Sequence, residues 1–237
     1  MPDYLRLVLE GPLLAFGGEA VDARGVIEDF PASSMLTGLL ANALGWQRHH
    51  RQALSALQQR LYYAARIDRE GRDLTDFQTV KLGKDDKGWT TRGAPEGRDG
   101  GAGTYNSPHI RYRDYQADKR VVVALTLLPA EASPSLVELA QALDQPARPL
   151  FLGRKACLPS LPINAGFVTA ENLLAALSSL PPADGAITTR VLLPENEEAA
   201  LGDELRQWSD ARNWLSGVHG GGRLVRIRSL RPQQVTP

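Results

Sequence analysis

Apolar residues alternate with polar ones along some segments of the chain, which predicts strands, and recur every three or four residues along others, which predicts helices. Leu5, Leu7 and Leu9 share one face of a strand expected over residues 4–9. A helix is expected over residues 33–44, with a serine as its N-cap and Gly45 at its C-cap. Further strands are expected over residues 61–67, 74–82, 120–128, 151–152, 187–193 and 224–230, and further helices over residues 50–60, 134–143 and 172–177.

The pattern breaks between Gly83 and Tyr115. This segment is rich in glycine and contains few apolar side chains. A stretch of that length without core residues is typical of a flexible loop or a protruding hairpin. We therefore expect residues 83–115 to leave the domain as an insertion.

The elements around the insertion follow the order strand, helix, strand, strand, helix, strand. This order is the ferredoxin-like pattern of an α+β domain. Its six places are filled by residues 4–9, 33–44, 61–67, 120–128, 134–143 and 151–152. We expect a core over residues 1–165, interrupted by the insertion, and a C-terminal β-rich region over residues 166–237. Many unrelated functions use this fold, so the pattern alone does not decide function.

Composition and charge argue against a disulfide-bonded, cysteine–zinc or membrane protein. The 27 basic residues equal the 27 acidic ones, so any surface for nucleic acid must be local. Cys157 is the only cysteine, which excludes an intrachain disulfide and argues against a cysteine-based zinc site. No window approaches the roughly 20 apolar residues of a membrane helix, and the start of the chain does not resemble a signal peptide. We expect a cytoplasmic protein without membrane contact.

Three groups of basic residues predict a local surface for a polyanion. The first group consists of Arg48, Arg51, Arg60, Arg66, Arg69 and Arg72. The second group consists of Lys81, Lys84, Lys87, Arg92, Arg98, Arg111, Arg113, Lys119 and Arg120. The third group consists of Arg206, Arg212, Arg223, Arg226, Arg228 and Arg231. Acidic residues gather instead over residues 195–204, and this separation favours nucleic acid on one side of the molecule. Ordinary solvated charge is the alternative, and for any single arginine it is the better explanation.

Two local features suit a phosphate group. A helix that begins at Ser33 and Ser34 would present free backbone N–H groups to an anion. Gly153, which precedes Arg154 and Lys155, would let a nucleic-acid backbone approach closely. Aromatic residues also lie among the cations of the insertion, where they could stack on an unpaired base or pack the base of a hairpin. These aromatic residues are Trp89, Tyr105, Tyr112 and Tyr115.

The chain lacks the common enzymatic motifs. It contains no G-x-x-x-x-G-K-[ST], no G-x-S-x-G and no H-E-x-x-H sequence. His49 and His50 are adjacent, so they cannot form the i, i+4 pair of a helical metal site. His109 stands near Arg111 and Arg113, and the three could serve either as base and phosphate clamp in RNA cleavage or as a basic surface. His219 could be a loop residue or an RNA contact.

Five blocks of the chain occur in an order that resembles one known family. They are GPLLAFG at residues 11–17, FPASSMLTGLLANALGWQR at 30–48, RID and DFQTV at 66–68 and 76–80, RYRDYQAD with the next valine-rich strand at 111–123, and PLFLGRKACLPSLPI at 149–163. Together they resemble the Cas-five family of subunits of the type I-E CRISPR surveillance complex, Cascade. The likeness covers roughly the first 165 residues, and the very glycine-rich insertion departs from familiar members.

The resemblance implies both a fold and a function. Members have an RRM-related, RAMP-type ferredoxin-like core with a protruding thumb, which corresponds to residues 83–115. They bind the repeat-derived 5′ handle of the guide RNA, cap the filament of backbone subunits and contact the large subunit, in an assembly that binds target DNA in antiviral defence. The type I-E subunit is not a nuclease, but a type I-C relative cuts RNA. A metal-independent endoribonuclease that uses His109 therefore stays as an alternative, as does an adaptor that touches only protein.

We combine motif, position and charge to choose the residues expected to contact RNA. Three of them lie in the matching blocks, one lies in the loop before the first helix, two mark the start of that helix, and two belong to the insertion. They are Arg24, Ser33, Ser34, Arg48, Arg111, Arg113, Arg154 and Lys155. No catalytic residue, cofactor or metal ligand is expected.

Overall fold

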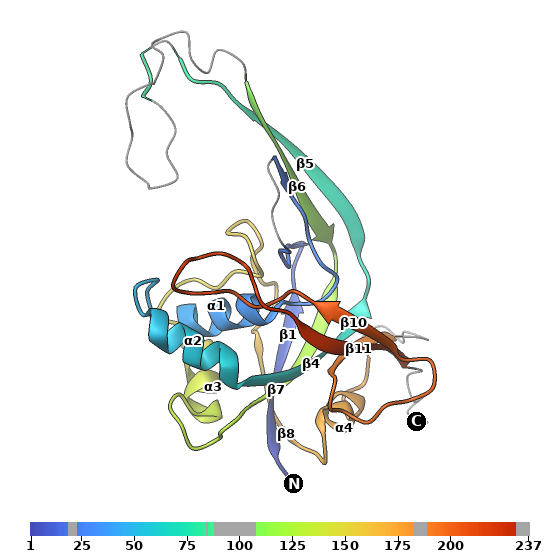
Figure 1. The fold of residues 1–237 in the computed structure, drawn as a ribbon. Coiled ribbons are helices and arrows are strands. Elements are labelled where there is room, and N and C mark those ends of the chain that lie inside the picture. Colours follow the sequence, from blue (N-terminus) through green and yellow to red (C-terminus); the bar gives the residue numbers. More distant parts are fainter. Residues whose placement is uncertain (19–22, 84, 88–107, 183–188, 231–237) are drawn as a thin grey trace.

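The computed structural model describes residues 1–18, 23–83, 85–87, 108–182 and 189–230. Its centre is an antiparallel sheet with the strand order β10-β11-β9-β4-β7-β1-β8 (Figure 1). The strands are β1 (Asp3–Glu10), β4 (Leu61–Arg69), β7 (Arg120–Leu127), β8 (Asn164–Thr169), β9 (Thr189–Pro194), β10 (Glu204–Trp208) and β11 (Arg223–Leu230). Strands β9 to β11, which follow residue 165, continue the sheet that β1, β4, β7 and β8 form.

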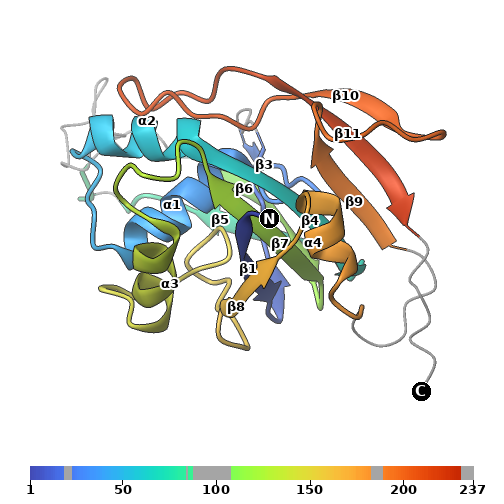
Figure 2. The same cartoon turned by 90° about the horizontal axis from the view of Figure 1, so that it is seen from below.

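Helices cover both faces of this sheet (Figure 2). On one face, α1 (Ser33–Ala43), α2 (Arg51–Arg60) and α3 (Leu136–Asp144) pack against the leucines of β1 and alternate residues of β7. On the other face, α4 (Leu173–Ser178) packs against Val122 and Ala124 of β7 and Ala64 of β4. Strand β7 is therefore buried on both sides, which explains its unbroken run of apolar residues.

The chain follows the predicted order of strand, helix, strand, strand, helix, strand, except in its last place. The strand predicted at Phe151 and Leu152 is wrong, and β8 fills that place beside β1. The backbone of Leu152 bonds instead to Ala15 and Cys157, and Gly153 then turns the chain at a φ of +104°. Strand β8 escaped prediction because its sequence, NAGFVT, does not alternate in hydrophobicity.

Two long strands, β5 (Arg72–Val80) and β6 (His109–Ala117), pair along their whole length and project away from the sheet (Figure 1). We call this hairpin the arm. Two short strands, β2 (Leu13–Leu14) and β3 (Arg24–Gly25), pair with β6. The projection begins at β5, before the predicted insertion, and most side chains of β5 are exposed. Most of the glycine-rich segment, including Trp89 and Tyr105, lies outside the described residues.

The described ranges contain no helix that is long and apolar enough to cross a membrane. Within the same ranges, no group of three or more His, Cys, Asp and Glu side chains could hold a metal ion.

Candidate nucleic-acid interface

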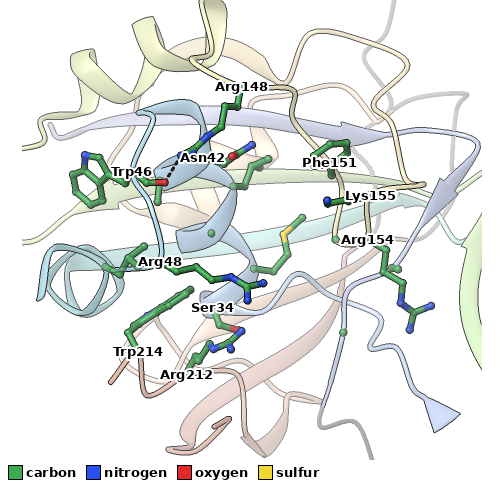
Figure 3. Close-up of a pocket in the computed structure, with 18 of the residues that line it drawn as sticks. Ser34, Asn42, Trp46, Arg48, Arg148, Phe151, Arg154, Lys155, Arg212 and Trp214 are labelled. Carbon is green, nitrogen blue, oxygen red and sulfur yellow. Dashed lines mark hydrogen bonds between the residues drawn. The ribbon is translucent and has the colours of Figure 1, made fainter. Parts of the chain in front are cut away.

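A cavity of about 670 Å³ opens between α1, the segment after α1, the segment at residues 148–155 and the loop at residues 209–222 (Figure 3). We call it the cationic pocket, because five basic side chains line it and no carboxylate of a described residue does. The five are Arg48, Arg148, Arg154, Lys155 and Arg212. Because like charges gathered without acid raise the local potential, the lining of the pocket favours an anion.

The pocket also offers flat apolar surfaces and neutral hydrogen-bonding groups. The aromatic rings of Trp46, Phe151 and Trp214 lie in its wall. Polar side chains complete the lining, namely Ser34, Asn42, Gln47 and His219. Cations for phosphates, rings for stacking and polar groups for base edges are the combination that unpaired nucleic acid requires.

Arg48 reaches the pocket from the turn that ends α1. Gly45 adopts a φ of +79°, as the expected C-cap glycine does, and the Trp46 N–H donates to the Ala41 carbonyl. The guanidinium of Arg148 then donates to the carbonyl of Trp46. This bond joins the turn after α1 to the segment that begins at residue 148, and these two segments form adjacent parts of the pocket wall.

Gly153 makes room for the chain's own backbone. A Cβ there would lie 1.9 Å from the carbonyl oxygen of Ala15. Gly153 is exposed and lines the pocket, and the approach of a nucleic-acid backbone to it stays a prediction. Arg154 donates to the carbonyls of Asp114 and Gly25 and lies 4.8 Å from the centre of the Tyr115 ring. Lys155 next to it is exposed.

The start of α1 also differs from the prediction. Its N-cap is Ala32, and no serine side chain caps it. The N–H of Ser33 donates to the Asp210 carboxylate at 3.0 Å, and that of Ser34 donates to the Asp210 carbonyl at 2.9 Å. The predicted free amides are thus already bonded within the protein, because a distant acidic residue satisfies the helix end. Ser33 is buried, while Ser34 still lines the pocket.

The loop at residues 209–222 is held at one side of the pocket by α2. Gln58 accepts from the backbone N–H of Arg212 at 3.1 Å and donates to its carbonyl at 3.0 Å. The same side chain accepts from the indole N–H of Trp214 at 3.1 Å. Burial and the charge of Arg48 lower the pKa of Arg212, which places the two guanidinium groups within electrostatic reach of each other.

The other predicted contacts lie outside the pocket, with Arg111 and Arg113 on the arm and Arg24 on β3 beside it. Arg24 forms an ion pair with Asp114 at 3.0 Å. Arg111 and Arg113 stand on β6 and each donates to the carbonyl of the preceding residue. The structure therefore brings together Ser34, Arg48, Arg154 and Lys155, and leaves Arg24, Arg111, Arg113 and Ser33 outside the pocket lining.

The three basic groups do not form one surface. Several members serve the fold: Arg66 pairs with buried Asp68, Lys119 with Asp29, and Arg228 with Asp203. This last pair joins the third basic group to the acidic segment at residues 195–204, so the expected separation of charge is wrong there. The pocket instead takes its cations from three separate segments, at residue 48, residues 148–155 and residue 212.

Sequence reasoning missed several residues of the pocket. Trp46 lies within one family-like block, and Arg148 directly precedes another. Arg212 belongs to the third basic group. Neither position nor charge distinguished these three residues from their neighbours as parts of a site. Phe151 was assigned to a strand, and Trp214 carried no signal. His109 does not line the pocket, whereas His219 does.

The match to known proteins covers most of the described fold. Residues 4–226 match a family model described as "CRISPR-associated protein (Cas_Cas5)". The chain belongs to this Cas5 family. It is 31% identical over 215 residues to a protein of Escherichia coli (strain K12) named "CRISPR system Cascade subunit CasD", covering 87% of this chain and 86% of the relative.

Solved structures show the same fold. A chain from a structure described as "CRISPR RNA-guided surveillance complex" superposes with a TM-score of 0.66 at 23% identity, covering 97% of this chain and 90% of that one. A chain described as "Crystal structure of Cas protein" gives a TM-score of 0.62 at 24% identity, covering 98% of this chain and 95% of that one. The Cas5 family resemblance identified from the sequence is thereby confirmed.

Proposed function

We propose that this Cas5-family chain is a non-catalytic subunit of a type I-E CRISPR Cascade complex and holds the repeat-derived 5′ handle of the guide RNA. The observation that carries the proposal is the cationic pocket, in which five basic side chains meet and to which no described residue contributes an acidic one. The named E. coli relative, a Cascade subunit, supports the assignment to such a complex.

The pocket suits an unpaired strand better than a duplex. Its rings, Trp46, Phe151 and Trp214, line a concave wall where a base that is free of its partner could stack. Arg48 and Lys155 lie in the same wall and can neutralise phosphates. A duplex would present only its backbone and would leave the rings without a function.

We further propose a ferredoxin-like, RAMP-type core with the arm as its thumb. The neighbouring strands β8-β1-β7-β4, with α1 and α3 on one face, have the order that this fold requires. The half-buried cations of the arm, Arg111 and Arg113, would follow the RNA beyond the pocket, and Arg24 stands beside them on β3. In the assembly, the subunit would cap the backbone filament, contact the large subunit and meet target DNA.

The proposal is tested with the purified full chain and single-stranded RNA that carries the repeat-derived handle. We expect saturable binding that weakens with salt and no cleavage in the presence of EDTA. Lys155→Gln should lower the affinity about three- to tenfold, because a phosphate contact to a cation is lost. Exposed Arg51, which does not line the pocket, supplies the control Arg51→Gln with near-normal affinity.

Two results would contradict this function. Specific cleavage of repeat RNA that disappears in His109→Ala would favour an endoribonuclease. Absence of cross-links between the chain and guide RNA in the assembled complex would favour an adaptor that touches only protein.

A further inference from the structure

Arg212 is placed differently from Arg223 and Arg228, two arginines near the C-terminal end of the sheet that form ion pairs. Arg223 pairs with Asp210 at 2.9 Å and Arg228 pairs with Asp203 at 2.6 Å. Arg212 lies instead over the ring of Trp214, at 5.4 Å from its centre, and its Nε is buried without a hydrogen-bond partner. A buried guanidinium nitrogen without a partner costs free energy unless a ligand accepts from it.

The cation that faces Arg212 comes from a distant part of the chain. Arg48 lies in the turn after α1 and extends into the same part of the pocket, beside Trp214 and Ser34 (Figure 3). The pKa of Arg212 responds to the charge of Arg48, so the two groups repel each other when the pocket holds no anion. An anion between them would convert this repulsion into two attractions.

The fold fixes Arg212 in this position although the position is unfavourable in itself. Asp210 anchors the loop at residues 209–222 to α1 and β11, and Gln58 bonds both backbone groups of Arg212. The bond from Trp214 to Gln58 holds the ring against which Arg212 lies. These contacts stabilise the loop, but none neutralises the guanidinium, which is the pattern expected of a ligand-binding group.

We propose that Arg48 and Arg212 form a clamp for one phosphodiester group of the bound RNA strand, with Gln58 as the residue that positions Arg212. The clamp rests on the proposed function and assigns a role to the C-terminal third of the chain. Guanidinium groups suit this task because each presents a planar fork of N–H donors that matches two phosphate oxygens.

The clamp predicts coupled losses in a double-mutant cycle. Arg48→Gln and Arg212→Gln should each lower the affinity of the full chain for handle RNA by about tenfold, the effect of losing one charge-assisted contact. The double variant should lose less than the product of the two factors, because both side chains hold the same group. Its plot of log affinity against log salt should flatten by about 0.7, the value for one phosphate on a single strand.

An abasic RNA strand of the same length separates phosphate from base recognition. The clamp requires the same losses on this probe. If they vanish on the abasic strand, the two arginines read a base and the clamp is wrong. A flattening by about 1.4 in the double variant would assign each arginine its own phosphate and also overturn it.

The positioning role of Gln58 has its own test. Gln58→Leu should reproduce the loss of Arg212→Gln but cause little further loss when Arg212 is already replaced. An equal loss in both backgrounds would show that Gln58 acts elsewhere. Urea unfolding of each variant identifies any that fail to fold. Trp214→Phe, which removes the indole bond to Gln58 and keeps an aromatic ring beside Arg212, then serves as the milder substitute.

Failure of the clamp is distinguishable from failure of the proposed function. If the wild-type chain does not bind handle RNA, both are wrong. If the wild-type chain binds, and both arginine variants keep its affinity and salt dependence, only the clamp is wrong.

Discussion

Asp210 shows how much of this fold depends on one buried side chain. Its carboxylate accepts from the Ser33 N–H at 3.0 Å, the Tyr63 hydroxyl at 3.0 Å and the Arg223 guanidinium at 2.9 Å. It is 1% exposed. It therefore joins the start of α1, the strand β4 and the strand β11, and it fixes one end of the loop that lines the pocket.

Replacement of Asp210 by alanine is expected to destabilise the protein by about 3–5 kcal/mol, because it leaves the Arg223 charge and other polar groups without their acceptor. The free energy of unfolding in urea measures this effect. Asp73→Ala, which removes an exposed carboxylate from β5, is the matched control and should change stability little. Equal stability of the two variants would show that the Asp210 network contributes nothing net.

Arg154 is one of the side chains that attach the arm to the rest of the molecule. Its two donors bond to carbonyls of β6 and β3, and its guanidinium covers the ring of Tyr115. Lys155, the next residue, is exposed and lines the pocket. Two adjacent cations of one motif therefore have separate tasks, one mainly structural and one available for RNA.

This separation predicts different outcomes for Arg154→Gln and Lys155→Gln. The first should increase amide hydrogen exchange in β3 and β6, because two bonds that hold these strands to the segment at residues 152–157 are lost. The second should leave exchange unchanged. Mass spectrometry of exchanged peptides measures both, and unchanged exchange in Arg154→Gln would show that the arm does not depend on this side chain.

The hairpin of β10 and β11 is tied to the segment before it by the pair of Asp203 and Arg228. The bond from Arg228, at 2.6 Å, is the main reason that the pKa of Asp203 falls from 3.8 to about 2. A carboxylate with a lowered pKa in the folded state stabilises that state above its ordinary pKa and loses this contribution as the pH falls through the folded value.

The wild-type chain should therefore lose stability between about pH 4 and about pH 2 through this residue. In Asp203→Asn that part of the pH dependence should be absent, although the variant is less stable near neutral pH. Urea midpoints across the pH range measure the difference between the two proteins. Parallel curves for both would rule out a contribution from Asp203.

At the scale of the whole molecule, the charges are balanced in number but not in place. The 27 basic and 27 acidic residues cancel formally. Many arginines bond to carboxylates or backbone carbonyls of the protein itself. Arg66, for example, pairs with Asp68 and donates to the carbonyl of Leu177. The cationic pocket is a local exception, because the described residues of its lining include no acid to weaken its potential. A chain without net charge can therefore still present a local surface that suits a polyanion.

Most elements of the fold could be predicted from the sequence because hydrophobic periodicity is a local property. The leucines of β1, the spacing in α1 and the apolar run of β7 each show their buried face within a few residues. The prediction failed at Phe151 and at β8, where the chain is placed by contacts with Ala15 and with β1. Such contacts join residues that are distant in the sequence, so hydrophobic periodicity within a short segment cannot predict them.

By itself, the sequence determined the order of the central elements and membership of the Cas5 family, because hydrophobic periodicity and the family-like blocks are both properties of contiguous residues. Those blocks also singled out Arg48 and Lys155 as candidate site residues, and both line the pocket. Only the tertiary structure decided which cations meet in the pocket, that Asp210 occupies the start of α1, and that Arg212 faces Arg48. The physical reason is that the partner of a charge is chosen by proximity in space, and residues as distant as Ser33 and Asp210 become neighbours only when the sheet and helices pack.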